Sequence, residues 1–101
     1  QTVPNPTTTA ILRAGGLADR AMYFRNDLAY AATSGAIPKN PHTFLTNIGS
    51  AAGAPFAVAA QTQIALFFQS FGALTIDPDG AGPIFEMPIV PPLPETLNYL
   101  P

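Results

Sequence analysis

The segment from residue 40 to residue 71, NPHTFLTNIGSAAGAPFAVAAQTQIALFFQSF, constrains the fold more than any other part of the chain. It contains the longest helix that the sequence supports, from Pro55 to Phe71. Proline suits the first turn of a helix, and Gly72 stands where a helix commonly ends. Apolar residues recur at helical spacing and predict one broad face packed in a core. These residues are Phe56, Ala60, Ile64, Phe67, Phe68 and Phe71.

Two shorter elements precede this helix. Pro4 and Pro6 disfavour regular structure at the start of the chain. Residues 7–12 are β-prone and predict a short strand that ends at the turn Gly15-Gly16. Residues 17–32 predict a helix, with Asp19 as its N-cap and Gly35 just past its end. The alternation of apolar residues from 22 to 30 also fits a strand, so that alternative stays open.

The chain after the helix is rich in turn residues and proline. Residues 73–76 predict a strand, residues 77–82 a turn, and residues 83–90 a second extended segment. Residues 91–101 form a proline-rich tail of a kind that lies along another surface. We therefore divide the chain into residues 1–74, which contain the loop of His42 and the final helix, and residues 75–101, an extended proline-rich C-terminal tail.

The scarcity of charge limits what the chain can do. Only ten of 101 residues are charged and 48% are hydrophobic, whereas about a quarter of a typical soluble domain is charged. We therefore expect much of the apolar surface to meet another chain. The four basic residues form no cluster, which argues against nucleic-acid binding, and Arg20, Arg25 and Asp27 are expected on a solvated or ion-paired face.

Other classes of protein are excluded by residue type and run length. There is no cysteine, so the chain has no disulfide, thiolate metal site or cysteine nucleophile. No apolar run reaches the ~18 residues of a membrane span. The chain begins at Gln1, which we interpret either as trimming or as processing of a longer polypeptide.

The only histidine, His42, precedes the long helix on a predicted loop between Pro38 and the helix start. Its side chain titrates near neutrality, so it is a candidate general base; the alternative is an ordinary exposed loop residue. The chain has no GxSxG motif, and the nearest string, from Gly49 to Gly53, has the wrong spacing. A nucleophilic serine must therefore come from elsewhere if His42 is catalytic.

The stretch PHTFL followed by AVAAQTQIALFFQSFGAL resembles the C-terminal part of secreted bacterial lipases and esterases with the α/β-hydrolase fold. The resemblance covers residues 8–74. It implies the C-terminal portion of an α/β fold, completed by a larger chain or an N-terminal fragment that carries the nucleophilic serine. It further implies that His42 is the catalytic base, that Asp19, or else Asp27, is the triad acid, that the substrate is an ester, and that the protein is secreted or periplasmic.

Residues 75–86, TIDPDGAGPIFE, offer a candidate calcium loop. Asp77, Asp79 and Glu86 occupy positions 3, 5 and 12 of an EF-hand frame. Turn chemistry of the DPDG sequence explains the same residues without a metal.

Two hypotheses about function follow. The first is a fragment or subunit of a serine carboxylic ester hydrolase that supplies the catalytic histidine. The second is a non-enzymatic, secreted structural or self-assembling protein, which the low charge and the proline-rich tail favour.

Overall fold

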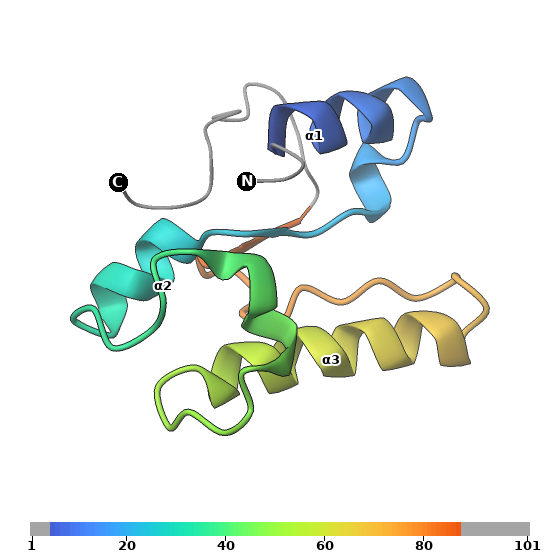
Figure 1. The fold of residues 1–101 in the computed structure, drawn as a ribbon. Helices are drawn as coiled ribbons and strands as arrows, with labels where there is room; N and C mark the ends of the chain where they lie inside the picture. Colours follow the sequence, from blue (N-terminus) through green and yellow to red (C-terminus); the bar gives the residue numbers. More distant parts are fainter. Residues whose placement is uncertain (1–4, 88–101) are drawn as a thin grey trace.

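The computed structural model describes residues 5–87, and Figure 1 labels α1, α2 and α3. In chain order they are α1 (Asn5–Ala14), the short 3₁₀ helix η1 (Ala18–Arg20), β1 (Tyr23–Phe24), α2 (Asn26–Ala32), the 3₁₀ helix η2 (Pro41–Thr46), α3 (Ala54–Gln69) and β2 (Phe85–Glu86). Pro4, residues 88–90 of the predicted extended segment, and the proline-rich tail lie outside the described residues.

The long helix is confirmed and the two flanking strand predictions are wrong. α3 runs from Ala54 to Gln69 with Pro55 in its first turn. Residues 7–12 lie within α1, because Pro6 is compatible with a first helical turn and residues 10–14 are mostly good helix formers. Residues 73–76 form no strand, since the structure gives them no partner strand.

Both alternatives for residues 17–32 are realised, each on part of the segment. Tyr23 and Phe24 form β1 and pair antiparallel with Glu86 and Phe85 of β2, and α2 begins only at Asn26. The continuous helix is therefore wrong: pairing with residues about 60 positions away overrides the local helical period.

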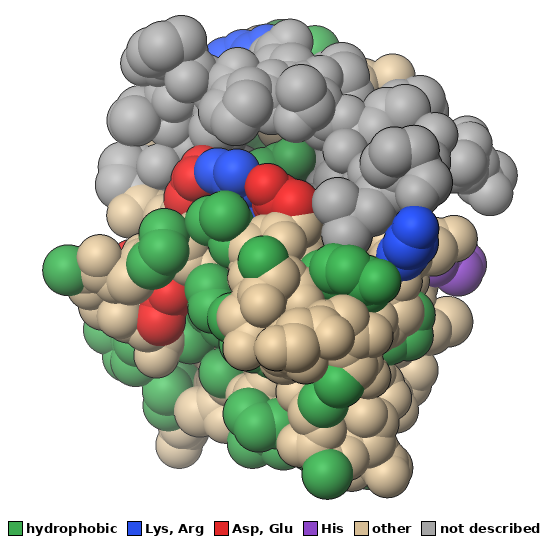
Figure 2. Space-filling view, turned by 90° about the vertical axis from the view of Figure 1, so that its left-hand side faces the viewer, with side chains coloured by type: hydrophobic (Ala, Val, Ile, Leu, Met, Phe, Trp, Pro, Cys, Tyr) green, Lys and Arg blue, Asp and Glu red, His purple; other side chains and the backbone are tan. Residues whose placement is uncertain are grey.

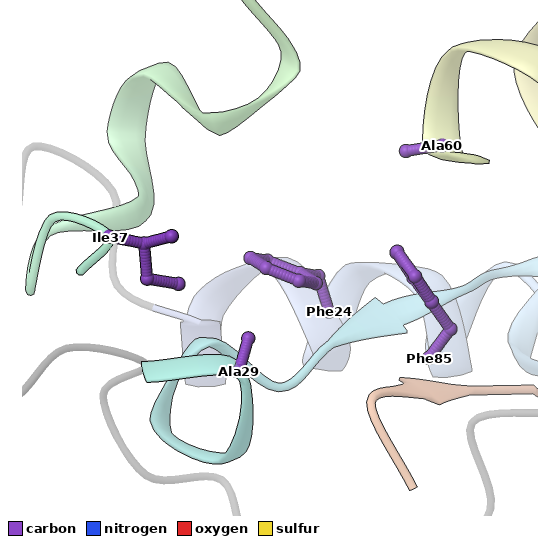
Figure 3. Close-up of a cluster of buried hydrophobic side chains, with 5 residues drawn as sticks. All are labelled: Phe24, Ala29, Ile37, Ala60 and Phe85. Atoms are coloured by element: carbon purple, nitrogen blue, oxygen red, sulfur yellow. The ribbon is translucent and has the colours of Figure 1, made fainter. Parts of the chain in front are cut away.

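The core lies where β1, α2, α3 and β2 meet. Figure 3 shows the ring of Phe24 in the middle of the five labelled buried side chains. This ring stacks on Phe44 of η2, with centroids 4.2 Å apart and planes 13° apart, and lies 5.3 Å from the ring of Phe85. The other members of the cluster are Ala29, Ile37 and Ala60. A few aromatic contacts thus hold elements that are far apart in the sequence.

All three α-helices end in the same hydrogen-bonded turn. In α3 the N–H of Gly72 donates to the carbonyl of Phe67 at 2.8 Å, and the N–H of Phe71 donates to that of Phe68 at 3.1 Å. This pattern is the Schellman motif, whose second-last residue has a positive φ. That residue is Gly16 after α1 (φ +66°), Ser34 after α2 (φ +52°) and Phe71 after α3 (φ +55°). Gly72, with φ +80°, is thus the second left-handed residue of this turn, and Phe71 is the first.

The described residues contain one sheet, and it has two strands. The expectation that the chain is the C-terminal portion of an α/β-hydrolase fold stays a prediction, because the remaining strands would belong to another chain. No helix in the described part is long and apolar enough to cross a membrane.

Candidate functional site

The sequence predicted that His42 lies on an open loop, but the structure places it on η2. The side chain of Asn40 caps this helix: its Oδ1 accepts a hydrogen bond of 3.0 Å from the backbone N–H of His42. Pro41 in the first turn also favours the helix. The His42 side chain is exposed and makes no hydrogen bond or ion pair with any described residue. It is thus accessible to a group outside this chain.

Asp19 lies in η1 and is exposed. It is not a helix cap: the N-cap residue of η1 is Leu17, and no side chain caps that end. Within the described residues, Asp19 and His42 share no hydrogen bond or ion pair. A triad needs the acid to orient the base through such a bond, so the structure does not bring the two predicted catalytic residues together.

Asp27, the other predicted acid, is held by Arg25. The guanidinium donates to both carboxylate oxygens of Asp27, at 3.0 Å and 2.7 Å, and to Glu86 of β2 at 2.7 Å. These bonds lower the pKa of Asp27 and raise that of Arg25. The predicted ion-paired face is therefore real for Arg25 and Asp27, and it ties α2 to β2.

The acidic residues of the predicted calcium loop have other roles. The carboxylate of Asp79 accepts hydrogen bonds from the backbone N–H groups of Ile84, at 2.9 Å, and Phe85, at 3.2 Å. Glu86 is engaged by Arg25. No three His, Cys, Asp or Glu side chains in the described chain lie close enough to hold a metal ion. The turn interpretation of this segment is the one the structure supports, with Asp79 fixing the start of β2.

The broad core face predicted for α3 is only partly correct. Ala60 is buried and Phe56 and Phe67 are half-buried, but Phe68 is 72% and Phe71 is 99% exposed. α3 lies along one edge of the molecule and packs on η2 (Figure 1). A chain of this size supplies too few elements to cover the rest of the face.

The exposed part of α3 belongs to a larger uncharged surface. No Asp, Glu, Lys or Arg occurs between Lys39 and Asp77. Ten large hydrophobic side chains are exposed in the described chain, and eight of them lie in this stretch. They are Leu45, Ile48, Val58, Ile64, Phe68, Phe71, Leu74 and Ile76. We call residues 40–76 the uncharged face. In Figure 2 most basic and acidic side chains lie in the upper half of the view, one acidic group lies at the left near mid-height, and the bottom of the view is hydrophobic or tan.

A groove of about 330 Å³ opens on this surface between α3, η2 and the segment before β1. Its walls are apolar apart from Arg20 and the amide of Gln63. The other lining residues are Met22, Phe44, Leu45, Ala60, Ile64, Phe67 and Phe68. The sequence showed the period of α3 but gave no sign of this groove, because Met22 and Leu45 reach it only through tertiary packing.

No family model, curated protein or solved structure matches the chain. The resemblance to lipases and esterases therefore stays a prediction.

Proposed function

We propose that this chain is a self-associating module whose uncharged face docks on the same face of a second copy. One observation carries the proposal: eight of the ten exposed large hydrophobic side chains fall in a stretch that has no formal charge. Exposed apolar surface in such amount marks interaction sites on soluble proteins. The proposal corresponds to the self-assembling alternative derived from the sequence.

The chemistry of the face favours a second copy as its partner. A charged partner would lose the hydration of its own charges here, and residues 40–76 offer no opposite charge to compensate that loss; the one charged side chain beside them is Arg20, at the groove. A second copy presents an equally uncharged surface and carries no such penalty. A two-fold dimer needs only one patch that is complementary to itself, and symmetric dimers of this kind are the commonest assemblies.

The test compares two substitutions of similar exposure in sedimentation experiments over a range of protein concentrations. Phe68 is 72% exposed inside the uncharged face, and Ile11 is 67% exposed on α1, outside it. We expect the wild type and Ile11→Glu to dimerise and Phe68→Glu to remain monomeric, with unchanged circular dichroism in all three. A monomeric wild type, or equal loss in both variants, would contradict the proposal.

The exposed imidazole of His42 favours a second candidate function. In this proposal the chain is the C-terminal portion of an α/β-hydrolase and supplies His42 as general base to a serine on a larger chain. The larger chain also supplies the orienting acid, because Asp19 forms no hydrogen bond or ion pair with His42. Such a protein would be a secreted or periplasmic ester hydrolase.

The test of this second candidate uses the chain together with the chain that carries the serine. His42→Ala should lower kcat for ester hydrolysis by orders of magnitude and leave KM nearly unchanged, because a base acts in the transition state. The matched control is Thr43→Ala, which changes the exposed neighbour of His42. Equal turnover in wild type and His42→Ala would end the catalytic assignment.

A further inference from the structure

Phe71 combines two unfavourable features. Its side chain is 99% exposed, so the ring contacts almost nothing within its own chain. Its φ is +55°, in the left-handed region that bulky residues rarely occupy. The fold therefore gains little from this ring and bears a backbone strain to hold it.

The other two helices place smaller residues at this position, although Ser34 (φ +52°) is also a non-glycine residue in the left-handed region. The corresponding residue of the same C-terminal turn is Gly16 after α1 and Ser34 after α2, both small. Strained backbone in a folded protein occurs mainly at functional sites. Phe71 is thus marked by comparison with two equivalent turns in the same molecule.

The uncharged face also contains the receptor that such a ring would need. The groove beside α3 has a volume of about 330 Å³, which exceeds that of one phenyl ring and lies at the lower end of the range for ligand sites. Phe44, Phe67 and Phe68 line it and offer ring edges and faces. Phe71 is not among the lining residues, so its ring is left for the groove of another molecule.

We propose that Phe71 of each copy inserts into the groove of the other, so that this exchange forms the centre of the dimer. The inference rests on the proposed self-association and names its anchor. Aromatic side chains buried in a pocket of the partner carry much of the binding energy of protein interfaces.

The positions of Phe71, which we call the knob, and of the groove along α3 allow each of two copies to insert its ring into the other. Ile64, Phe67 and Phe68 line the groove in the last two turns of the helix, and Phe71 follows one turn later. The proposed dimer packs two copies of α3 antiparallel through their C-terminal turns and places each Phe71 in the groove of the other copy. Two reciprocal contacts related by a two-fold axis give a dimer and no open filament.

The first experiment removes the knob and the groove separately. Phe71→Gly deletes the ring and suits the left-handed backbone, and Ile64→Glu fills the groove wall with a charged side chain that keeps good helix propensity. We expect each variant to self-associate more than about tenfold more weakly than the wild type in sedimentation, the loss expected for a buried aromatic anchor. Leu45→Glu blocks the same groove from η2 and replaces Ile64→Glu if the latter melts below the wild type.

The second experiment mixes the two variants, one of them fluorescently labelled. Phe71→Gly retains an intact groove, and Ile64→Glu retains an intact knob. A mixed dimer therefore restores one of the two contacts, so the mixture should associate more strongly than either variant alone. Simple adhesion between apolar surfaces predicts no such rescue.

The outcomes separate this inference from the proposed function. A wild type that stays monomeric overturns both. A wild type that dimerises, together with Phe71→Gly that dimerises equally well, overturns the exchange alone, as does a mixture no stronger than its components. Loss in each variant with rescue in the mixture supports it.

Discussion

At the scale of single residues, Phe71 lowers the stability of its own chain through its left-handed backbone and, in the proposed dimer, strengthens association. A non-glycine residue in the left-handed region loses about 1–2 kcal/mol, and glycine gives back about 0.5–1 kcal/mol of this through its larger entropy in the unfolded chain. We therefore expect Phe71→Gly to increase the free energy of unfolding by about 0.5–1 kcal/mol. Urea unfolding at low protein concentration, where the monomer dominates, measures this change.

Gly72 provides the matched control for that measurement. Its φ is +80°, and an added Cβ would lie 3.3 Å from the ring of Phe67. Gly72→Ala should therefore lower the free energy of unfolding by about 1–2 kcal/mol. Destabilisation by both substitutions would show that the Phe71 ring stabilises its own chain.

Residue-level prediction from the sequence succeeded where a rule is local and failed where it depends on context. The position of Gly72 predicted a helix that ends at Phe71, two residues beyond the last residue of α3, Gln69. The rule then assigns the left-handed backbone to glycine, so it could not show that Phe71 occupies that conformation too. His42 was the only histidine and easy to single out, but its place on η2 depends on the Asn40 cap, which the sequence analysis did not recognise.

At the scale of elements, β2 depends on the turn that precedes it. The Asp79 carboxylate accepts hydrogen bonds from the backbone N–H groups of Ile84 and Phe85, immediately at the start of the strand. Asp79→Ala leaves these partly buried donors without their acceptor and should lower the free energy of unfolding by about 1–3 kcal/mol. Chemical denaturation measures the loss.

A second substitution tests the same turn from the other side. A Cβ at residue 82 would clash with the carboxylate of Asp79. Gly82→Ala should therefore displace Asp79 and destabilise the chain, and the double variant with Asp79→Ala should lose little more than Asp79→Ala alone. Additive losses would mean that Gly82 acts independently of the Asp79 hydrogen bonds.

The contact between α2 and β2 makes stability depend on pH. Hydrogen bonds from Arg25 lower the pKa of Asp27, so its stabilising effect is complete above the ordinary carboxyl pKa of about 3.9 and disappears as the pH falls through the lower, folded value. Burial and the nearby Asp79 raise the pKa of Asp77, so protonation of Asp77 adds stability on acidification and partly offsets the loss.

The corresponding prediction concerns the slope of stability against pH. Asp27→Asn should make the decline in unfolding free energy below about pH 4 shallower than in the wild type. Asp19→Asn is the control, because the Asp19 carboxylate forms no ion pair with a described residue. Thermal melts in a series of acidic buffers measure both. Parallel curves for Asp27→Asn and the wild type would contradict the role of the Arg25 pair.

The elements that the sequence predicted best are those whose signal is local. α3 has proline at its start, glycine after its end and a sustained helical period, and it was found within a few residues. β1 and β2 are two residues long and exist because Phe24 and Phe85 pair across some 60 positions. A single sequence carries no local signal for such pairing, and residues 17–32 therefore looked like one helix.

At the scale of the whole molecule, the low number of charged residues predicted an apolar surface that polar groups do not cover, but it could not show where on the fold this surface lies. The helical period put Ile64, Phe68 and Phe71 in the core together with Ala60. The described part of the chain covers only one side of α3, so its apolar face is divided between a buried edge and an exposed one. Periodicity gives the face of a helix, but the number of neighbouring elements decides how much of it is buried.

This division predicts opposite behaviour for two phenylalanines. Phe24 is 7% exposed at the centre of the core, whereas Phe68 is 72% exposed on the uncharged face. At low protein concentration, Phe24→Ala should lower the free energy of unfolding by about 3–5 kcal/mol, and Phe68→Ala should change it by less than about 0.5 kcal/mol. Denaturation of the dilute monomer distinguishes the two roles.

Raising the protein concentration should then reveal the role of Phe68. Association with a second copy stabilises the folded state by mass action, so the Tm of the wild type should rise with concentration. Phe68→Ala should largely abolish this rise because the side chain lines the groove that receives the second copy in the proposed dimer. Ile11→Ala, on α1, should melt like the wild type at every concentration. A wild-type Tm independent of concentration would show that the uncharged face does not join copies of this chain, and a large loss from Phe68→Ala in the dilute monomer would show that Phe68 belongs to the core.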